Sequence, residues 1–313
     1  MKSLVDILDL SSKEIDDLIK VSLDVISSPD KYTSACAGKI LATLFFEPST
    51  RTRLSFESAM YSLGGRVLSV AGGNTSSAAK GESVSDTVKV VSCYSDIIAM
   101  RHPKEGAALV AAKVAGVPVI NAGDGGHCHP TQTLADLLTI YRERGSLSGL
   151  TVGVCGDLKF GRTVHSLINA LSRYSNMKFV LISPAELKVP SYVKNETLKK
   201  YNIPYYQTEN LEEVLPDLDI LYMTRIQKER FFNEEDYIRL RDSYILTPEK
   251  LTGAAPGLCI MHPLPRVNEI SVAVDADPRA CYFKQVKNGK FIRAALIMKL
   301  LTDAGQRIVL ADG

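Results

Sequence analysis

The stretch Phe-Phe-Glu-Pro-Ser-Thr-Arg-Thr-Arg at residues 45–53 decides how this chain folds. It closes an apolar run, residues 40–46, whose length and composition predict a buried strand. Pro48 ends that strand because proline has no N–H group to donate to a sheet. A helical pattern begins at Leu54 and stops at Gly64. The residues in between therefore occupy the turn where a strand passes into the N-terminus of a helix.

The polar side chains of this turn suit an anion. A helix N-terminus offers free backbone N–H groups and the positive end of the helix dipole. Hydroxyls at Ser49, Thr50 and Thr52, with guanidinium groups at Arg51 and Arg53, match a phosphate better than a neutral ligand. Helix capping is the alternative, because serine and threonine commonly begin helices. A cap needs only one hydroxyl and no arginine, so we favour a phosphate site.

Apolar runs recur along the chain, and helical segments separate them. The further predicted strands are residues 65–70, 96–100, 117–122, 150–155, 179–183, 219–223 and 258–261. Such alternation indicates an α/β fold with two domains, each a mostly parallel sheet flanked by helices. We expect domains at residues 1–130 and 131–285. Within residues 286–313, an apolar helix from Phe291 to about Asp303 is expected to cross back onto the first domain.

Composition limits the possible partners. The 313 residues suffice for about two domains, and 37 Lys and Arg against 35 Asp and Glu leave a net charge of +2. This balance provides no general attraction for nucleic acid or a membrane surface. We find no apolar stretch of membrane-spanning length and no signal-peptide core. The six cysteines form no Cys-x-x-Cys pair, which favours reduced thiols in the cytoplasm.

Two further motifs follow predicted strands in the first half. Arg101 lies at the carboxyl edge of a sheet, where ligands of open α/β sheets bind. His129 and Gln132 flank Pro130, a favourable first residue for a helix, and can aim at one point. The sequence His-Cys-His at residues 127–129 suggests a metal as the alternative. Adjacent residues rarely chelate one ion, so we predict no metal.

The second half repeats this arrangement with motifs that suit carboxylates. Residues 156–163 resemble a P-loop, but Arg162 replaces its lysine, which argues against a nucleoside triphosphate. An arginine at a helix start binds a carboxylate as readily as a phosphate. Arg225 and Gln227 follow another strand. In His-Pro-Leu-Pro-Arg at residues 262–266, two prolines constrain the backbone, so that exposed carbonyls can accept from an amine; a rigid turn is the alternative.

In combination, these motifs resemble the aspartate/ornithine carbamoyltransferase family nearly from end to end. The matching segments are residues 49–53, 80–82, 101–103, 129–132, 156–166, 224–227 and 262–266. The ornithine branch typically has His-Cys-Leu-Pro at the last of these, so His-Pro-Leu-Pro favours the aspartate branch. The resemblance implies transfer of the carbamoyl group of carbamoyl phosphate to L-aspartate, giving N-carbamoyl-L-aspartate and phosphate in pyrimidine biosynthesis. It implies no cofactor.

The resemblance also implies a role for each motif residue. Those implied to bind carbamoyl phosphate are Ser49, Thr50, Arg51, Thr52, Ser76, Lys80, Arg101, His129 and Gln132. Those implied to bind aspartate are Lys80, Arg162, Arg225, Gln227, Leu264 and Pro265. Catalysis would involve Arg51, Thr52, Lys80, Arg101 and His129. The resemblance further implies a homotrimer in which Ser76 and Lys80 reach into the site of the neighbouring chain.

Three alternatives stay open at this point. Ornithine or another amino acid could replace aspartate as the acceptor. A non-catalytic relative is disfavoured because every motif residue is present, and a nucleotide-dependent dehydrogenase lacks its glycine fingerprint here. Whether separate regulatory chains bind is left undecided by the sequence.

Overall fold

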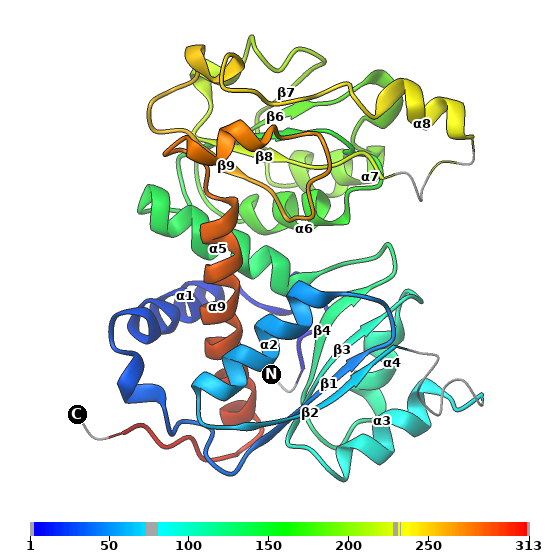
Figure 1. The fold of residues 1–313 in the computed structure, drawn as a ribbon, viewed down its shortest axis with the longest axis vertical. Helices are drawn as coiled ribbons and strands as arrows, with labels where there is room; N and C mark the ends of the chain where they lie inside the picture. Colours follow the sequence, from blue (N-terminus) through cyan, green and yellow to red (C-terminus); the bar gives the residue numbers. More distant parts are fainter. Residues whose placement is uncertain (1–2, 73–80, 228–230, 232, 312–313) are drawn as a thin grey trace. The chain divides into compact units, whose positions relative to one another are not determined.

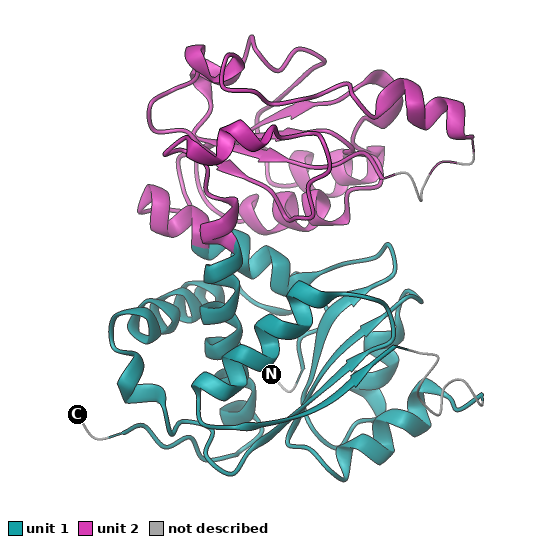
Figure 2. Ribbon diagram, viewed as in Figure 1, with its two compact units in different colours: residues 1–138, 286–313 teal, residues 139–285 magenta. Residues whose placement is uncertain are grey.

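The computed structural model describes residues 3–72, 81–227, 231 and 233–311. The chain forms two compact units, coloured separately in Figure 2. The first contains Met1–Leu138 and Val286–Gly313, and the second contains Thr139–Gln285. The units divide inside a helix that begins at Pro130.

The first unit is built on a four-stranded parallel sheet in the order β2-β1-β3-β4 (Figure 1). Its strands are β1 (Ile40–Phe45), β2 (Arg66–Ala71), β3 (Ile97–His102) and β4 (Val119–Asp124). Its helices are α1 (Ser12–Ser27), α2 (Thr50–Ser62), α3 (Val84–Ser92) and α4 (Ala107–Val114), with parts of α5 (Pro130–Arg144) and α9 (Tyr282–Asp303). The four strands lie within two residues of those predicted.

Burial explains why the first sheet forms as it does. All but the first residue of β1 are buried, as expected for a parallel strand covered on both faces. On one face Leu44 and Met100 pack in a cluster with Val88 of α3 and Ala108 of α4. Residues two apart on a strand share a face, so the alternate residues of β1 and β3 supply the other side of the sheet.

The start of α1 follows its capping residues. Ser11 and Glu14 form a capping box there, with the Ser11 N–H group 2.9 Å from Glu14 Oε2. Helix α2 begins at Thr50, four residues before the predicted start at Leu54. The prediction was wrong because the apolar periodicity begins only at Leu54, whereas Thr50 to Arg53 make the polar first turn.

The second unit contains a five-stranded parallel sheet in the order β7-β6-β5-β8-β9. Its strands are β5 (Thr151–Cys155), β6 (Lys178–Ile182), β7 (Tyr205–Thr208), β8 (Ile220–Met223) and β9 (Cys259–Met261). Its helices are α6 (Arg162–Leu171), α7 (Ser191–Val193) and α8 (Glu234–Leu240). Strand β7 was not predicted, because its residues are half-exposed at the sheet edge and form no apolar run.

The C-terminal helix joins the first unit, which confirms the predicted crossing. Lys299 of α9 lies 3.6 Å from Glu14 of α1, and Arg293 bonds to Ser55 of α2 at 2.8 Å. Helix α9 begins at Tyr282, nine residues before the predicted start at Phe291, because Gly289 and Asn288 interrupt the apolar pattern without ending the helix. Among the described residues, no helix combines the length and apolar character needed to cross a membrane.

Candidate functional site

The turn between β1 and α2 carries the predicted anion site. Ser49 is the residue before α2, and its side chain accepts no capping hydrogen bond. Capping therefore does not account for its hydroxyl. Thr50 and Arg51 are exposed in the first turn of the helix, while Thr52 is buried. This arrangement presents hydroxyl and guanidinium groups beside the positive end of the helix dipole.

Arg101 reaches the same sheet edge from the neighbouring strand. It pairs in register with Phe45, the last residue of β1, and its carbonyl accepts from the Phe46 N–H group at 2.9 Å. Its side chain is only 11% exposed, and Nε lies 3.1 Å from Glu47 Oε2. Glu47 therefore holds one side of the guanidinium group, which orients the remaining N–H groups.

Arg51 and Arg101 are close enough to influence each other. Partial desolvation lowers the pKa of Arg51, and the positive charge of Arg101 lowers it further. Although the Arg51 side chain is solvent-exposed, nearby protein still partly desolvates its charge. Two mutually repelling guanidinium groups at one sheet edge are stabilised by an anion between them.

His129 comes to this edge at the start of α5. Its carbonyl accepts from the N–H groups of Gln132 at 3.0 Å and Thr133 at 3.3 Å, so it occupies the start of the helix. Its ring is buried. A Cβ placed on Gly123, where φ is +119°, would lie 3.1 Å from Arg101 Nη1 and 3.5 Å from His129 Cδ2. The arginine and the histidine therefore flank the same glycine at the end of β4.

The first unit thus contains most of the residues predicted to bind carbamoyl phosphate. The β1–α2 turn supplies Ser49 to Thr52, β3 supplies Arg101, and the start of α5 supplies His129 and Gln132. Ser76 and Lys80, which were predicted to act on a neighbouring chain, lie outside the described residues.

In the second unit, the ends of β5 and β8 approach closely because a glycine separates them. Gly156 has φ of +120°, and a Cβ there would lie 2.3 Å from the carbonyl oxygen of Thr224. Only glycine permits this approach. Arg162 is the first residue of α6, after β5, while Arg225 and Gln227 follow β8 and are half-buried. These three of the six predicted aspartate-binding residues therefore lie beyond the carboxyl ends of adjacent strands.

A buried carboxylate organises this second set. Asp157 is fully buried and accepts from the Phe160 N–H group at 2.9 Å and from Gln227 Nε2 at 3.4 Å. Burial raises the pKa of Asp157, and these hydrogen bonds oppose the rise. Since a carboxylate accepts from the amide nitrogen, Gln227 Oε1 is directed elsewhere. Asp157 therefore fixes the orientation of a residue implied in substrate binding.

The His-Pro-Leu-Pro motif follows β9 and has a fixed backbone. The Leu264–Pro265 peptide bond is cis, and Leu264 has φ of +52°. The Leu264 N–H group donates to His262 Nδ1 at 2.8 Å, and His262 Nε2 lies 2.7 Å from Glu269 Oε1. Because Nδ1 accepts, the ring proton is on Nε2 and is donated to Glu269. The Leu264 N–H group is thus engaged inside the turn.

Glu269 stabilises this turn by accepting hydrogen bonds from it. Its burial favours the neutral acid, but hydrogen bonds from His262 and from the Val267 N–H group lower the pKa of Glu269 overall. Arg266, the last residue of the motif, is engaged elsewhere: Nη2 lies 2.7 Å from Asp275 Oδ2. Arg266 therefore stabilises the fold through its ion pair with Asp275.

Two other features of the first unit are poor candidates for the site. Asp6, His127 and Cys128 could place three ligand atoms within 4.8 Å of one another, the one such metal-type group among the described residues. The Cys128 thiol, however, lies 3.2 Å from the Val5 carbonyl, to which only a protonated thiol can donate. A metal ligand would be a thiolate.

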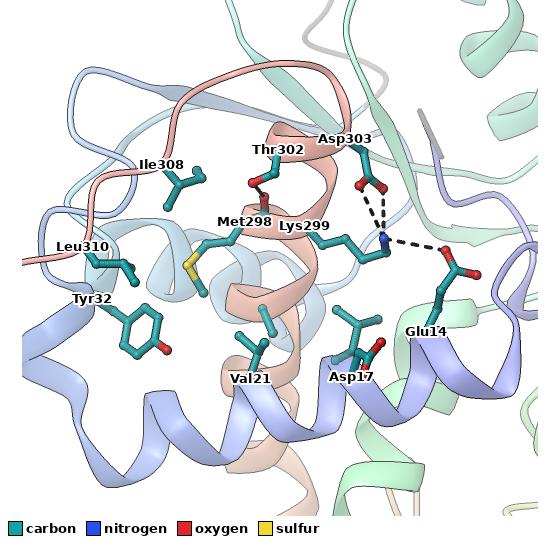
Figure 3. Close-up of a pocket in the computed structure, with 12 residues that line it drawn as sticks. Glu14, Asp17, Val21, Tyr32, Met298, Lys299, Thr302, Asp303, Ile308 and Leu310 are labelled. Carbon is teal, nitrogen blue, oxygen red and sulfur yellow. Dashed lines mark hydrogen bonds and ion pairs between the residues drawn. The ribbon is translucent and has the colours of Figure 1, made fainter.

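A cavity of about 410 Å³ lies between α1, α9 and the C-terminal segment (Figure 3). Its wall is mostly apolar, and Lys299 is paired there with Glu14 and Asp303. Since Asp17 adds a third carboxylate, acidic groups outnumber the single ammonium group. Such a wall does not attract a phosphate.

Sequence reasoning missed several residues that hold the site residues in place. Glu47 and Asp157 bind the predicted site residues Arg101 and Gln227. Glu269 binds His262, which in turn accepts from the Leu264 N–H group. Glu47 lies inside the motif at residues 45–53, but its partner Arg101 is 54 residues away. Only the charged character of these residues beside the motifs could have indicated a role.

Comparison with protein families gives two adjoining matches. Residues 2–142 match the aspartate/ornithine carbamoyltransferase carbamoyl-P binding domain, and residues 148–300 match the Asp/Orn binding domain of the same family. Together these matches cover most of the chain.

Individual relatives agree with this family. The aspartate carbamoyltransferase catalytic subunit of Lachnoclostridium phytofermentans is 62% identical over 301 residues, 96% of this chain and 98% of that protein. The corresponding subunit of Clostridium acetobutylicum is 61% identical over 300 residues, with the same coverage.

Among solved structures, a catalytic subunit of M. jannaschii aspartate transcarbamoylase superposes with a TM-score of 0.91. It is 47% identical, over 97% of this chain and 99% of that one. Aspartate transcarbamoylase from Trypanosoma cruzi in complex with N-(phosphonacetyl)-L-aspartic acid gives a TM-score of 0.89 at 38% identity, over 95% of each chain.

Proposed function

This chain belongs to the aspartate/ornithine carbamoyltransferase family, and we propose that it transfers the carbamoyl group of carbamoyl phosphate to L-aspartate. The products are N-carbamoyl-L-aspartate and phosphate, in a step of pyrimidine biosynthesis. Relatives about 60% identical over nearly the whole chain carry the aspartate enzyme's name. The observation that carries the proposal is the convergence of Arg51, Arg101 and His129 on one sheet edge of the first unit.

The first unit binds carbamoyl phosphate. Its phosphate lies at the N-terminus of α2, where hydroxyl groups, backbone N–H groups and the Arg51 guanidinium donate to it. The neighbouring guanidinium of Arg101 offsets the remaining anionic charge. The residues assigned to this substrate are Ser49, Thr50, Arg51, Thr52, Arg101, His129 and Gln132.

The carbonyl oxygen of the substrate gains negative charge when the amine attacks. Thr52, Arg101 and His129 donate hydrogen bonds to this oxygen and stabilise the tetrahedral oxyanion. We expect His129 to act as a neutral donor, since nearby guanidinium charge disfavours an imidazolium. No covalent intermediate is required, because holding two substrates in a reactive geometry supplies about 7–11 kcal/mol. The departing phosphate accepts the proton of the amine.

The second unit binds aspartate. Arg162 and Arg225 pair with its two carboxylates, and Gln227, oriented by Asp157, adds a hydrogen bond. The N–H group of Leu264 is already bound to His262, and the carbonyl of Leu264 accepts from the attacking amine. Pro265 shapes the turn beside it.

The active oligomer is a homotrimer in which Ser76 and Lys80 of one chain complete the site of the next, with Lys80 contacting both substrates. An exposed apolar surface supports association: Leu54 and Tyr61 lie seven residues apart on one face of α2, and Leu68 is exposed on the edge strand β2. Relatives named catalytic subunits imply a separate regulatory chain as a further partner.

A panel of acceptors tests the proposed substrate. The purified chain is supplied with carbamoyl phosphate and, in turn, L-aspartate, L-ornithine and other amino acids, and phosphate release is measured. We expect turnover with L-aspartate alone. Turnover with ornithine and not aspartate would contradict the assignment.

Mixed trimers test the shared site. Chains carrying Lys80→Ala and chains carrying Arg51→Ala are each expected to be inactive as homotrimers. When they are mixed, some sites combine an intact Arg51 with an intact Lys80 from the neighbour, so part of the activity returns. The control is each variant mixed with itself. If mixing restores no activity, each chain has a self-contained site.

A further inference from the structure

A hydrogen bond on α5 holds the amide of Gln132 in one orientation. Gln132 Nε2 lies 2.8 Å from Oδ1 of Asp136, one helical turn later on the same face. Gln132 is half-buried, and Asp136 is completely buried. An ionised carboxylate can only accept, so it binds the NH₂ end of the amide and leaves Oε1 directed away.

This orientation depends on the charge of Asp136. A protonated Asp136 would carry an O–H group, which could donate to Gln132 Oε1 and turn the amide around. A cation nearby favours the ionised carboxylate, and with it the observed orientation of the amide.

Arg293 of α9 supplies this cation. It is 4% exposed, and its guanidinium group donates to Ser55 Oγ at 2.8 Å. The guanidinium carbon also lies 5.2 Å from the centre of the Phe56 ring. Burial lowers the pKa of Arg293 to about 10, and attraction to Asp136 opposes this shift. Arg293 therefore remains charged near neutral pH, and the attraction is mutual.

We propose that Asp136 is a positioning residue that, through Gln132, makes the site select an NH₂ group on the substrate carbonyl. With its own NH₂ group bound to Asp136, Gln132 presents Oε1 as an acceptor to the NH₂ group of carbamoyl phosphate. Arg293 maintains this polarity. The inference rests on the proposed function, in which Gln132 contacts carbamoyl phosphate.

Acetyl phosphate is the matched probe, because a methyl group replaces the NH₂ group while the carbonyl and phosphate are retained. The dissociation constants of carbamoyl phosphate and acetyl phosphate are measured for the full chain and for Asp136→Asn. Asparagine can donate or accept, so it no longer holds Gln132 in one orientation. We expect the preference for carbamoyl phosphate to fall about 2- to 12-fold, which corresponds to one neutral hydrogen bond of about 0.5–1.5 kcal/mol. A general loss of structure would weaken both ligands alike and leave the ratio unchanged.

A double-mutant cycle separates positioning from other effects. In a Gln132→Ala background, Asp136→Asn is expected to change the ratio no further. Independent, additive effects of the two substitutions, or an unchanged ratio in Asp136→Asn, would overturn the inference. If Gln132→Ala itself leaves the ratio unchanged, the proposed contact between Gln132 and substrate is wrong, which is a failure of the site assignment instead.

A second pair of variants serves if Asp136→Asn does not fold. Arg293→Gln removes the cation while retaining a donor for Ser55, and Arg293→Lys retains the cation. We expect the first to lower the preference for carbamoyl phosphate and the second to preserve it. Equal ratios in the two variants would show that charge at this position does not set the orientation of Gln132, and the inference would fall.

Discussion

Replacing Gly156 with alanine probes the closest approach of backbone in the second unit. The new Cβ would lie 2.3 Å from the Thr224 carbonyl oxygen and 2.7 Å from its Oγ1, and φ at this position is +120°. Neither neighbour is the flexible end of a long side chain, so the strands or the Thr224–Gln227 loop must move. The substitution therefore acts on both stability and the residues proposed to bind aspartate.

The magnitude follows from two costs. Forcing an L-residue into a positive-φ conformation costs about 1–2 kcal/mol, and overpacking a tight contact costs about 1–3 kcal/mol. We expect Gly156→Ala to lose about 2–5 kcal/mol. Gly149→Ala is the matched control, because Gly149 has φ of +75° and nothing within 4 Å of its Cβ position. This control should lose only the about 1–2 kcal/mol of stability that the positive-φ conformation costs.

Urea denaturation of both variants measures the difference, and initial rates at varied aspartate measure the functional effect. We expect Gly156→Ala to unfold at lower urea than Gly149→Ala and to require more aspartate for saturation. The reasoning is refuted if the two variants unfold at the same urea concentration, because the contact with Thr224 would then impose no cost.

Three further substitutions test the site and its support. Arg101→Ala should lower kcat/KM at least about 10- to 100-fold, because a charge-assisted hydrogen bond of roughly 1.5–3 kcal/mol is lost. Steady-state kinetics with varied carbamoyl phosphate measure this change, and a change below about twofold would contradict the proposed role of Arg101. Arg225→Ala should raise the KM for aspartate with little effect on carbamoyl phosphate, and unchanged aspartate saturation would remove Arg225 from the site. Folding lowers the pKa of Glu269, so the stability that its carboxylate contributes is fully present above the unfolded-state pKa near 4.5. That contribution is lost as the pH falls through the folded-state pKa. Urea unfolding between pH 6 and 3 should therefore show a steeper loss of stability in the native chain than in Glu269→Gln, and parallel profiles would contradict this.

Much of the fold was predictable because parallel strands covered on both faces consist of continuous apolar runs. Runs such as residues 40–46 and 150–155 correspond to β1 and β5. One strand whose side chains are only partly buried was not predicted. Strand β7 pairs through its backbone while its side chains are half-exposed, so its composition carries little signal.

Part of the candidate site was likewise predictable from the sequence, and part was not. Its principal residues follow strands or begin helices, and the carboxyl ends of parallel strands share one edge. The sequence therefore indicated that Arg101 and the β1–α2 turn would meet. It did not indicate Glu47 as the partner of Arg101, because any acidic residue near a motif has many possible partners. Asp136 lies one helical turn after Gln132, a spacing at which side chains of one helix meet.

The order of residues along the chain determined the family, the α/β architecture and the residue types proposed to face each substrate, because local periodicity and short motifs contain that information. The tertiary structure decided which buried charges attract each other, such as Arg293 and Asp136, and how Asp157 orients Gln227. These interactions join residues as much as 157 positions apart, and their strength depends on distance and burial, which exist only once the chain has folded.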